Sequence, residues 1–539
     1  MLFCLSSSSG QSATAQQNPD TEARAQKYSL ILDLQSLNAE ASKVTAPLAR
    51  ASAKTEIANA AWTLKADWAR DLLSDAYDLT LPDEKERTKL REQPVGTTPS
   101  EPTEMDLARN RIRQRIFEIA RQDKDFAERL TQKVGQELGP TEEVRMYGAL
   151  VARAIQSGDT KAATTYARRA IETDPTQLVA GLSILEIAST DRELADKLIV
   201  DYINRLRSFP LSQDNAVRIY IGLRFAVSPN SNLDPNQRQI APAGPTATRA
   251  YLSYVIESLT TLESREPGSA ASLRSYLLSI WPLMNQYAPD LIGQFLTVEK
   301  VSRGSDENAP FPTASQEERG RATYEERLKN AYKNRNQKDI AEAVNHALGR
   351  QDFSEARKLI DLFSDEKMKT QYLEELNTRE SIALARDDEI APAEGIARRL
   401  QTPKSILRAY PVIISKCVAR KNSSCVTGLS YEAIKRLKWA DDQSNLPRTF
   451  AELTKSVAPA DAALAFEILD EMVKAANKSN VNTDNGNVGF DVEVFAVLAS
   501  RDENRTRQTA GMLEDRLQRI VALAAIYRWK LSEITRTRR

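Results

Sequence analysis

The stretch from residue 144 to residue 175 constrains the fold of this chain more than any other, because it reads as two short helices around one turn. In the first helix, Tyr147 and Leu150 recur at helical spacing, which places them on one face. Gly158 ends that helix with a permissive backbone, and Asp159 is a good N-cap for the next helix. The stretch therefore predicts a helical hairpin.

Small residues in the second helix predict how closely its partner can approach. Ala163 and Ala170 belong to a stripe of alanines, which lets two antiparallel helices pack tightly. Pro175 then stops the helix, because the residue before a proline disfavours the α region. A chain built from such units buries its apolar faces between neighbouring hairpins.

These residues together resemble a tetratricopeptide repeat. Tyr147 and Leu150 match the large positions of its first helix, and Gly158 with Asp159 matches its turn. Ala163 and Ala170 match the small positions, and Pro175 matches the ending. The departure is Val151, where the family usually has glycine. The resemblance covers about one repeat and implies an array of helix pairs that binds other polypeptides.

A helix cap followed four residues later by a small residue recurs at about the length of a helical hairpin. The caps are separated by 36 and 32 residues in a first run, and by 37, 35 and 37 in a second. The pairs are Asp123/Ala127, Asp159/Ala163, Asp191/Ala195, Asp352/Ala356, Glu389/Ala393, Ser424/Gly428 and Asp461/Ala465. Two regular runs favour an all-α fold, an α-solenoid of degenerate helical hairpins, over a chance pattern in an alanine-rich protein.

Composition agrees with that fold class. A chain of 539 residues exceeds the roughly 250–300 that one hydrophobic core serves, so it is either several domains or a repeat array. Only 6% of the residues are aromatic, and alternating Val, Ile and Thr are scarce, which argues against strands. Lys and Arg number 74, as do Asp and Glu, so the net charge is zero.

Breaks in the helical pattern predict the organisation of the chain. Two linkers and one long loop separate the helical parts, and the last helices are expected to cap the array by hiding its open apolar face. Whether the two runs form one superhelix or two lobes hinged at the long loop stays open. The segments are N-terminal helices 20–92, linker 93–103, first run 104–227, loop 228–248, helices 249–301, linker 302–315, second run 316–480 and capping helices 490–535.

The N-terminus resembles the rear half of a secretory signal peptide. A short apolar patch precedes Ala13 and Ala15, which form an A-x-A cleavage pattern before Gln16. A basic start is missing and the apolar core is short, so we expect residues 1–15 to be the remnant of a leader whose start codon lies upstream. Export to the periplasm or outside the cell is then expected, with a disordered tail of a cytoplasmic protein as the alternative.

The number of cysteines helps to distinguish an exported protein from a cytoplasmic one. Removal of the leader would leave Cys417 and Cys425, eight residues apart across a predicted bend between two helices. Such a bend can bring the Cα atoms within the roughly 4.4–6.8 Å that a disulfide needs. An even count fits an oxidising compartment, and the alternative is two unrelated buried thiols.

No residue pattern in the sequence carries catalytic chemistry. The single histidine, His346, lies on a predicted helix and is expected in the core or half exposed. One histidine excludes most triads and His-based metal sites. Glycine-rich phosphate loops are absent, so no catalytic residue, metal site or cofactor is expected.

The sequence therefore predicts a non-enzymatic, exported helical-repeat protein that binds a protein or peptide. No uninterrupted basic stripe suggests nucleic acid, and no apolar stretch approaches the roughly 20 residues that span a bilayer. Two alternatives remain. The first is a structural or assembly component of the cell envelope, and the second is an enzyme with a histidine-independent site between helical lobes.

Overall fold

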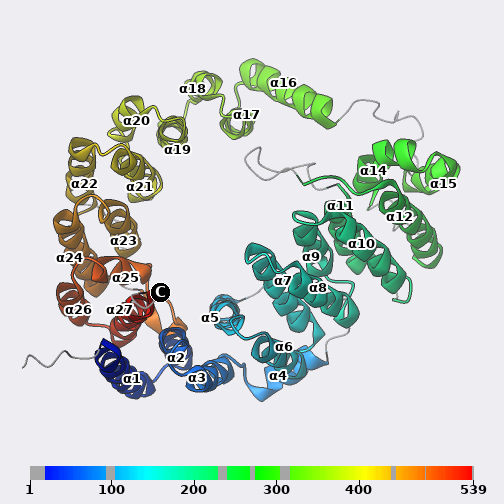
Figure 1. The fold of residues 1–539 in the computed structure, drawn as a ribbon. Helices are drawn as coiled ribbons and strands as arrows, with labels where there is room; N and C mark the ends of the chain where they lie inside the picture. The colour runs from blue at the N-terminus through cyan, green and yellow to red at the C-terminus, as the bar shows by residue number, and fades with distance from the viewer. Residues whose placement is uncertain are drawn as a thin grey trace, which may run out of the picture. The chain divides into compact units, whose positions relative to one another are not determined.

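A computed structural model of the protein describes residues 19–92, 103–209, 211–228, 240–266, 273–303, 316–438, 445–479 and 481–536. These residues form helices joined by short turns, with no strand among them (Figure 1). The predicted all-α repeat fold is confirmed. The predicted leader, with Ala13, Ala15 and Gln16, lies outside the described residues, as do most of both predicted linkers.

The chain forms two compact units, 1–72 with 442–539 and 73–441. The second unit begins within α3 (Ala66–Leu79) and holds the first run and most of the second run. Its helices up to the long loop are α4 (Glu84–Arg91), α5 (Glu104–Ala120), α6 (Lys124–Leu138), α7 (Pro140–Gln156), α8 (Thr160–Thr173), α9 (Leu178–Ala188), α10 (Arg192–Leu206) and α11 (Gln213–Val227).

The rest of this unit follows the long loop. The predicted end of that loop at residue 248 was wrong, because helix α12 already begins at Pro245. Proline suits the first helical turn, where its missing N–H leaves no bond unmade. The helices are α12 (Pro245–Arg265), α14 (Arg274–Tyr287), η2 (Pro289–Leu291), α15 (Ile292–Arg303), α16 (Gln316–Asn334), α17 (Gln337–Gly349), α18 (Phe353–Ile360), α19 (Glu366–Arg386), α20 (Ile390–Ala397), α21 (Pro403–Ala419) and α22 (Ser423–Leu437).

The opening repeat forms the hairpin α7–α8. Gly158 has a φ of +76°, and Asp159 accepts a hydrogen bond from the Ala162 N–H at 3.0 Å. Ala163 and Ala170 are fully buried, and the rings of Tyr147 and Tyr166 stack with centroids 6.4 Å apart. The two helices meet along this small-residue stripe.

The end of this repeat is held by a buried carboxylate. Helix α8 stops before Asp174, the residue that precedes Pro175. Both carboxylate oxygens of Asp174 accept hydrogen bonds, from the Thr176 N–H and hydroxyl at 2.9 and 2.6 Å and from the Gln177 amide at 2.8 Å. Because these bonds satisfy the carboxylate, it can be buried where helix α9 begins.

Four of the turns within hairpins share one backbone conformation. Gly158, Gln351, Asp388 and Lys421 all have positive φ, and each directly precedes the N-cap of the second helix of its hairpin. In each turn the cap N–H bonds the carbonyl five residues earlier, the pattern of a Schellman motif. Of these four turns, only that of α7–α8 has glycine at the residue with positive φ. This explains why the repeat α7–α8 is the easiest to identify from the sequence.

The predicted cap at Ser424 was wrong by two residues. Asn422 caps α22, because its side chain accepts from the Cys425 N–H, and Val426 rather than Gly428 takes the buried position four residues later. The other predicted small residues, Ala127, Ala195, Ala356, Ala393 and Ala465, are fully buried.

The other unit joins the two ends of the chain. Helices α1 (Pro19–Ser42) and α2 (Pro47–Ala61) pack against α27, and the Arg516 guanidinium donates to the Lys43 carbonyl at 3.0 Å (Figure 1). The remaining elements are α23 (Leu446–Val457), α24 (Ala462–Lys478), η3 (Thr483–Asn485), α25 (Glu493–Ala499), α26 (Glu503–Gly511) and α27 (Arg516–Arg536).

The last helices were predicted to cap the array by hiding its open apolar face, and in this unit α27 packs against helices from both ends of the sequence. The apolar stripe of α27, with Leu517, Val521 and Ala524 buried, packs against α1 and α2 as well as α25 and α26. A terminal repeat must bury its apolar face, and here segments from the start of the chain take part in that burial. The predicted second run is also divided, since α23 and α24 belong to this unit.

One close backbone contact offers a test of the packing. Gly181 in α9 faces Gly222 in α11, and a Cβ at Gly181 would lie 2.6 to 2.8 Å from Gly222 backbone atoms. Gly181→Ala should therefore destabilise the protein by about 1–3 kcal/mol through overpacking. Gly395→Ala is the control, because a Cβ there meets no atom within 4 Å and alanine favours the helix. Equal urea midpoints for the two variants would contradict the α9–α11 contact.

Candidate protein-binding surface

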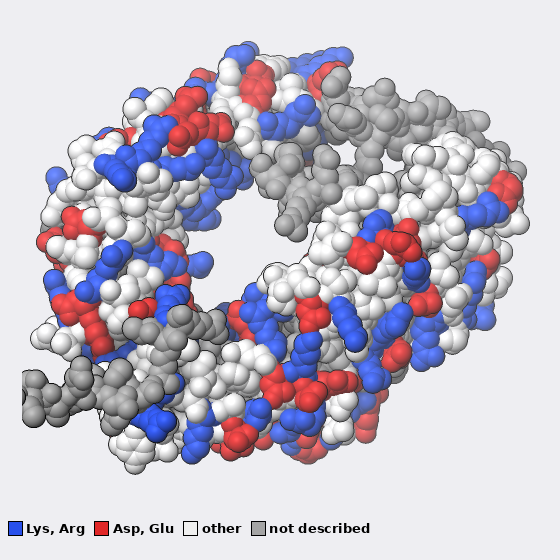
Figure 2. Space-filling model, in the orientation of Figure 1, with Lys and Arg blue, Asp and Glu red and all other residues white. Residues whose placement is uncertain are grey.

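The strongest local charge in the chain lies on α20–α22. Residues 390–438, here called the basic segment, contain ten Lys or Arg, two Glu and no Asp. The first run, residues 104–227, has nineteen basic and eighteen acidic residues, and the whole chain is neutral. Figure 2 shows Lys and Arg side chains gathered over these helices, at the upper left of the view. None of the ten side chains is buried.

Half of these cations contact carboxylates of neighbouring helices, of a turn or of their own helix. Arg408 bonds Glu375 at 2.6 Å, and Arg420 bonds the Asp388 carboxylate at 2.6 Å. Arg398, Arg436 and Lys416 also contact carboxylates. Four other exposed cations of the basic segment make no hydrogen bond or ion pair through their side chains within the described residues: Arg399, Lys404, Lys421 and Lys435. The same holds for Arg386, which lies just outside the segment at the end of α19.

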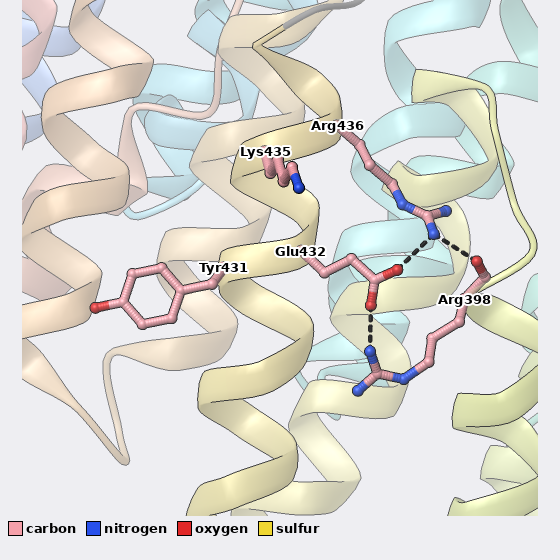
Figure 3. A pocket seen from close by; sticks show the side chains of 5 residues that line it. All are labelled: Arg398, Tyr431, Glu432, Lys435 and Arg436. Carbon is pink, nitrogen blue, oxygen red and sulfur yellow. Dashed lines mark hydrogen bonds and ion pairs between the residues drawn. The ribbon is translucent and has the colours of Figure 1, made fainter.

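The first of two hollows on this part of the chain lies beside α22 and is called the α22 hollow. Its volume is about 560 Å³, and its lining is Arg398, Tyr431, Glu432, Lys435 and Arg436. Figure 3 shows the Glu432 carboxylate between the two arginines, whereas Tyr431 points the other way. Glu432 accepts from Arg398 and from Arg436, each at 2.5 Å.

The hydrogen bonds among Arg398, Glu432 and Arg436 join α22 to the end of α20. The Arg436 guanidinium also donates to the backbone carbonyls of Arg398 and Leu400. The hydrogen bond to Glu394 raises the pKa of Arg398, so this guanidinium stays charged. Burial raises the pKa of Tyr410, on neighbouring α21, to about 12. The bonds made by Arg398 and Arg436 join helices, and Lys435 is the cation in this hollow that is left for a ligand.

The second hollow lies between the α17–α18 turn and the C-terminal half of α19, and is called the α19 hollow. Its volume is about 530 Å³. Apolar side chains of Leu348, Phe353, Ile382 and Ala383 line part of it. Its charged lining consists of Arg379, Arg386, Arg408 and Asp387. The volume of this hollow lies within the range of ligand pockets, although more of its exposed lining is polar than apolar.

A shared carboxylate positions two of these arginines. Glu375 accepts from the Arg379 Nε–H and from an Arg408 Nη1–H, each at 2.6 Å. Burial alone would raise the pKa of Glu375, but the hydrogen bonds from Arg408 and Arg379 lower it, so the carboxylate stays ionised. Both guanidinium groups keep further N–H donors that have no acceptor within the described residues. The Arg386 side chain makes no such bond at all.

The predicted cysteine pair lies in the same region. Cys417 near the end of α21 and Cys425 at the start of α22 are at disulfide-bonding distance, with Cα atoms 6.1 Å apart. Both side chains are buried. The pair spans the turn that carries Arg420 and Lys421, so a bond between the sulfurs would hold two cations of the basic segment in place.

The structure places the other predicted residues away from this surface. Gly158, Asp159, Ala163, Ala170 and Pro175 form the hairpin α7–α8 and the turn after it, where the alanines are buried and Asp159 caps α8 and pairs with Lys124. No group of three or more His, Cys, Asp or Glu residues within the described ranges is placed to hold a metal. None of the described helices is long and apolar enough to cross a membrane.

Sequence reasoning missed the basic segment, although its signal was present. A search for uninterrupted runs of Lys and Arg finds little here, because the ten cations are spread over three helices and their turns. Counting acidic residues over hairpin-length windows would have found it, since residues 390–438 contain only Glu394 and Glu432.

Comparison of the chain with protein-family models and with curated proteins found no match. A solved structure described as a circular tandem repeat protein with novel repeat topology and enhanced subunit contact surfaces matches 94% of this chain and 99% of its own. The identity is 14% and the TM-score is 0.15, a value too low to relate the two structures. The likeness to tetratricopeptide repeats remains a resemblance.

His346 offers a test of the region next to the α19 hollow. Its ring stacks on Tyr324 with centroids 4.9 Å apart, and its Nδ1 is buried without a partner. Burial lowers the pKa of His346, and the charges of Arg327 and Arg350 lower it further. The unfolded chain then binds more protons below its pKa of about 6.5. Stability should therefore fall as the pH drops through 6.5 and on through the lowered folded-state pKa.

The comparison is with His346→Phe, which keeps a stacking ring and removes the titration. Urea midpoints of both proteins measured from pH 7.5 to pH 5 should diverge, with the wild type losing more stability toward acid. Parallel profiles would show that His346 titrates alike in the folded and unfolded chains.

Proposed function

We propose that this chain is a non-enzymatic helical-repeat scaffold that binds another protein through the surface of α19–α22. The observation that carries the proposal is the basic segment, a local excess of exposed cations in a chain with no net charge. A patch of one sign steers association with a complementary surface and selects against partners of like charge.

The two hollows support binding rather than catalysis. Their ionisable lining is mainly arginine and lysine, and Glu432, the carboxylate of the α22 hollow, is engaged by two guanidinium groups. Asp387 is the one carboxylate in the lining of the α19 hollow. Neither hollow offers a pair of carboxylates for acid–base chemistry, or a nucleophile beside a base. The alternatives are an assembly component of the cell envelope and, less favoured, an enzyme.

We also propose that the protein acts in an oxidising compartment outside the cytoplasm. The support is the signal-like N-terminal sequence ending at Ala15 and the placement of Cys417 and Cys425 at disulfide distance. A bond there would fix the α21–α22 turn.

The scaffold proposal is tested by removing the unpaired cations and recovering bound proteins. The immobilised full chain is compared with a variant in which these residues become glutamine: Arg386, Arg399, Lys404, Lys421 and Lys435. Proteins that the wild type recovers from an extract of the native cells should not be recovered by the variant, because the electrostatic attraction to the five cations is removed. Glutamine at exposed helix positions should leave the fold unchanged.

The control removes the same number of exposed cations from the first run by the same change to glutamine. Those residues are Arg111, Arg121, Arg129, Lys161 and Arg168. The control should retain the partners. Equal loss in both variants would contradict a specific role for α19–α22. Self-association in light scattering with no partner recovered would instead favour the assembly component.

Export predicts a processed and oxidised product. The protein isolated from its native cells should begin at Gln16, and non-reducing mass spectrometry should find the peptides of Cys417 and Cys425 linked. A cytoplasmic product that retains Met1, with both cysteines alkylated as free thiols, would refute the compartment proposal without touching the scaffold proposal.

A further inference from the structure

The α19 hollow combines three features that bear on what it binds. It is open to solvent, part of its lining is apolar, and three arginines from α19 and α21 belong to the same lining. Arg379 and Arg408 are partly exposed, at 41% and 37% of their side-chain surfaces, so both are accessible from solvent.

We propose that the α19 hollow binds an acidic polypeptide segment, with an apolar side chain of that segment seated between Phe353 and Ile382. The proposal rests on the scaffold function above and names the chemistry of the partner. Arg386 binds one carboxylate of the segment, and the free N–H groups of Arg379 and Arg408 bind another.

The donor geometry favours carboxylates. A guanidinium presents five N–H donors, of which Arg379 commits only its Nε–H and Arg408 only an Nη1–H, both to Glu375. Glu375 holds these two side chains from neighbouring helices in place, so less side-chain entropy is lost when a second carboxylate binds. Charge-assisted bonds of this kind are about twice as strong as neutral ones.

The surroundings favour an acidic partner over a neutral one. The α19 hollow adjoins the basic segment through Arg408 and through Lys416, whose Nζ donates to the Arg386 carbonyl at 3.5 Å. Excess positive charge there raises the local concentration of an anionic segment. Asp387 is the negatively charged residue in the lining, and its side chain makes no hydrogen bond within the described residues. Asp387→Asn should therefore tighten the binding of the acidic segment.

The lining distinguishes a polypeptide from other polyanions. Single-stranded nucleic acid without sequence preference is usually bound on exposed aromatic platforms, and Phe353 is the only aromatic side chain in the lining of this hollow. An anionic membrane surface presents headgroups in a plane, whereas the arginines here line a recess together with aliphatic Leu348, Ile382 and Ala383. A peptide with alternating acidic and apolar side chains supplies both complementary groups.

The probe is a short fluorescein-labelled peptide of alternating glutamate and leucine, titrated with the full chain and followed by anisotropy. Peptides of glutamate with serine and of lysine with leucine, a single-stranded DNA oligonucleotide and phosphatidylserine vesicles are the comparison ligands. The glutamate–leucine peptide should bind tightest, and raising the salt should weaken it.

Arg386→Glu should weaken the binding of that peptide by about tenfold or more, because it replaces an attraction by a repulsion at the rim. Arg168→Glu makes the same charge change at an exposed arginine of the first run, outside this surface, and should cost no more than about threefold through the long-range field. Circular dichroism confirms that both variants are folded.

Three outcomes would overturn the proposal. The first is equal weakening by both variants, which would place the attraction in the general field. The second is equal binding of the glutamate–serine peptide, which would remove the apolar recess from the interaction. The third is tighter binding of the oligonucleotide or the vesicles. If no acidic peptide binds while the immobilised chain still recovers partners in a charge-dependent manner, this inference fails and the scaffold proposal stands.

Discussion

Close contact between paired helices at a buried small residue is the interaction on which this fold depends. At Ala127, Ala163, Ala195, Ala356, Ala393 and Ala465 the side chain is fully buried, four residues after the cap that starts the helix. A helix of this length is marginal alone in water and gains its stability from packing. Each hairpin therefore forms because its alanine face lets a partner helix approach, and larger residues such as Tyr147 and Tyr166 fill the space beside it.

The turns explain why the repeats look degenerate. Every hairpin turn of the Schellman type needs one residue with positive φ, and glycine is the residue that adopts it at least cost. The chain uses Gly158 once and Gln351, Asp388 and Lys421 elsewhere. Hydrogen bonds from the cap N–H and the packing of both helices hold those residues in place. The backbone motif thus recurs where its sequence signature is lost.

The same turns present the charged surface. In α19–α22 the helices and turns display exposed cations, and the buried faces provide the packing, so charge can accumulate without disturbing the core. Arg398, Arg408 and Arg436 use part of their hydrogen-bonding capacity to join helices. The side chains of Arg386 and Lys435 make no hydrogen bond or ion pair within the described residues. This division between structural and free cations is the basis for assigning a binding role to the surface.

The sequence by itself determined the all-α class, the hairpin period, six of the seven recurring cap positions and the cysteine pair, because these depend on residues close together in the chain. It did not determine that α27 packs on α1 and α2, since contacts between the two ends leave no local pattern. It also did not identify the α19 hollow, whose lining comes from four helices and is assembled only by packing. Local preferences fix the elements, and the tertiary structure alone decides which apolar faces and which charges meet.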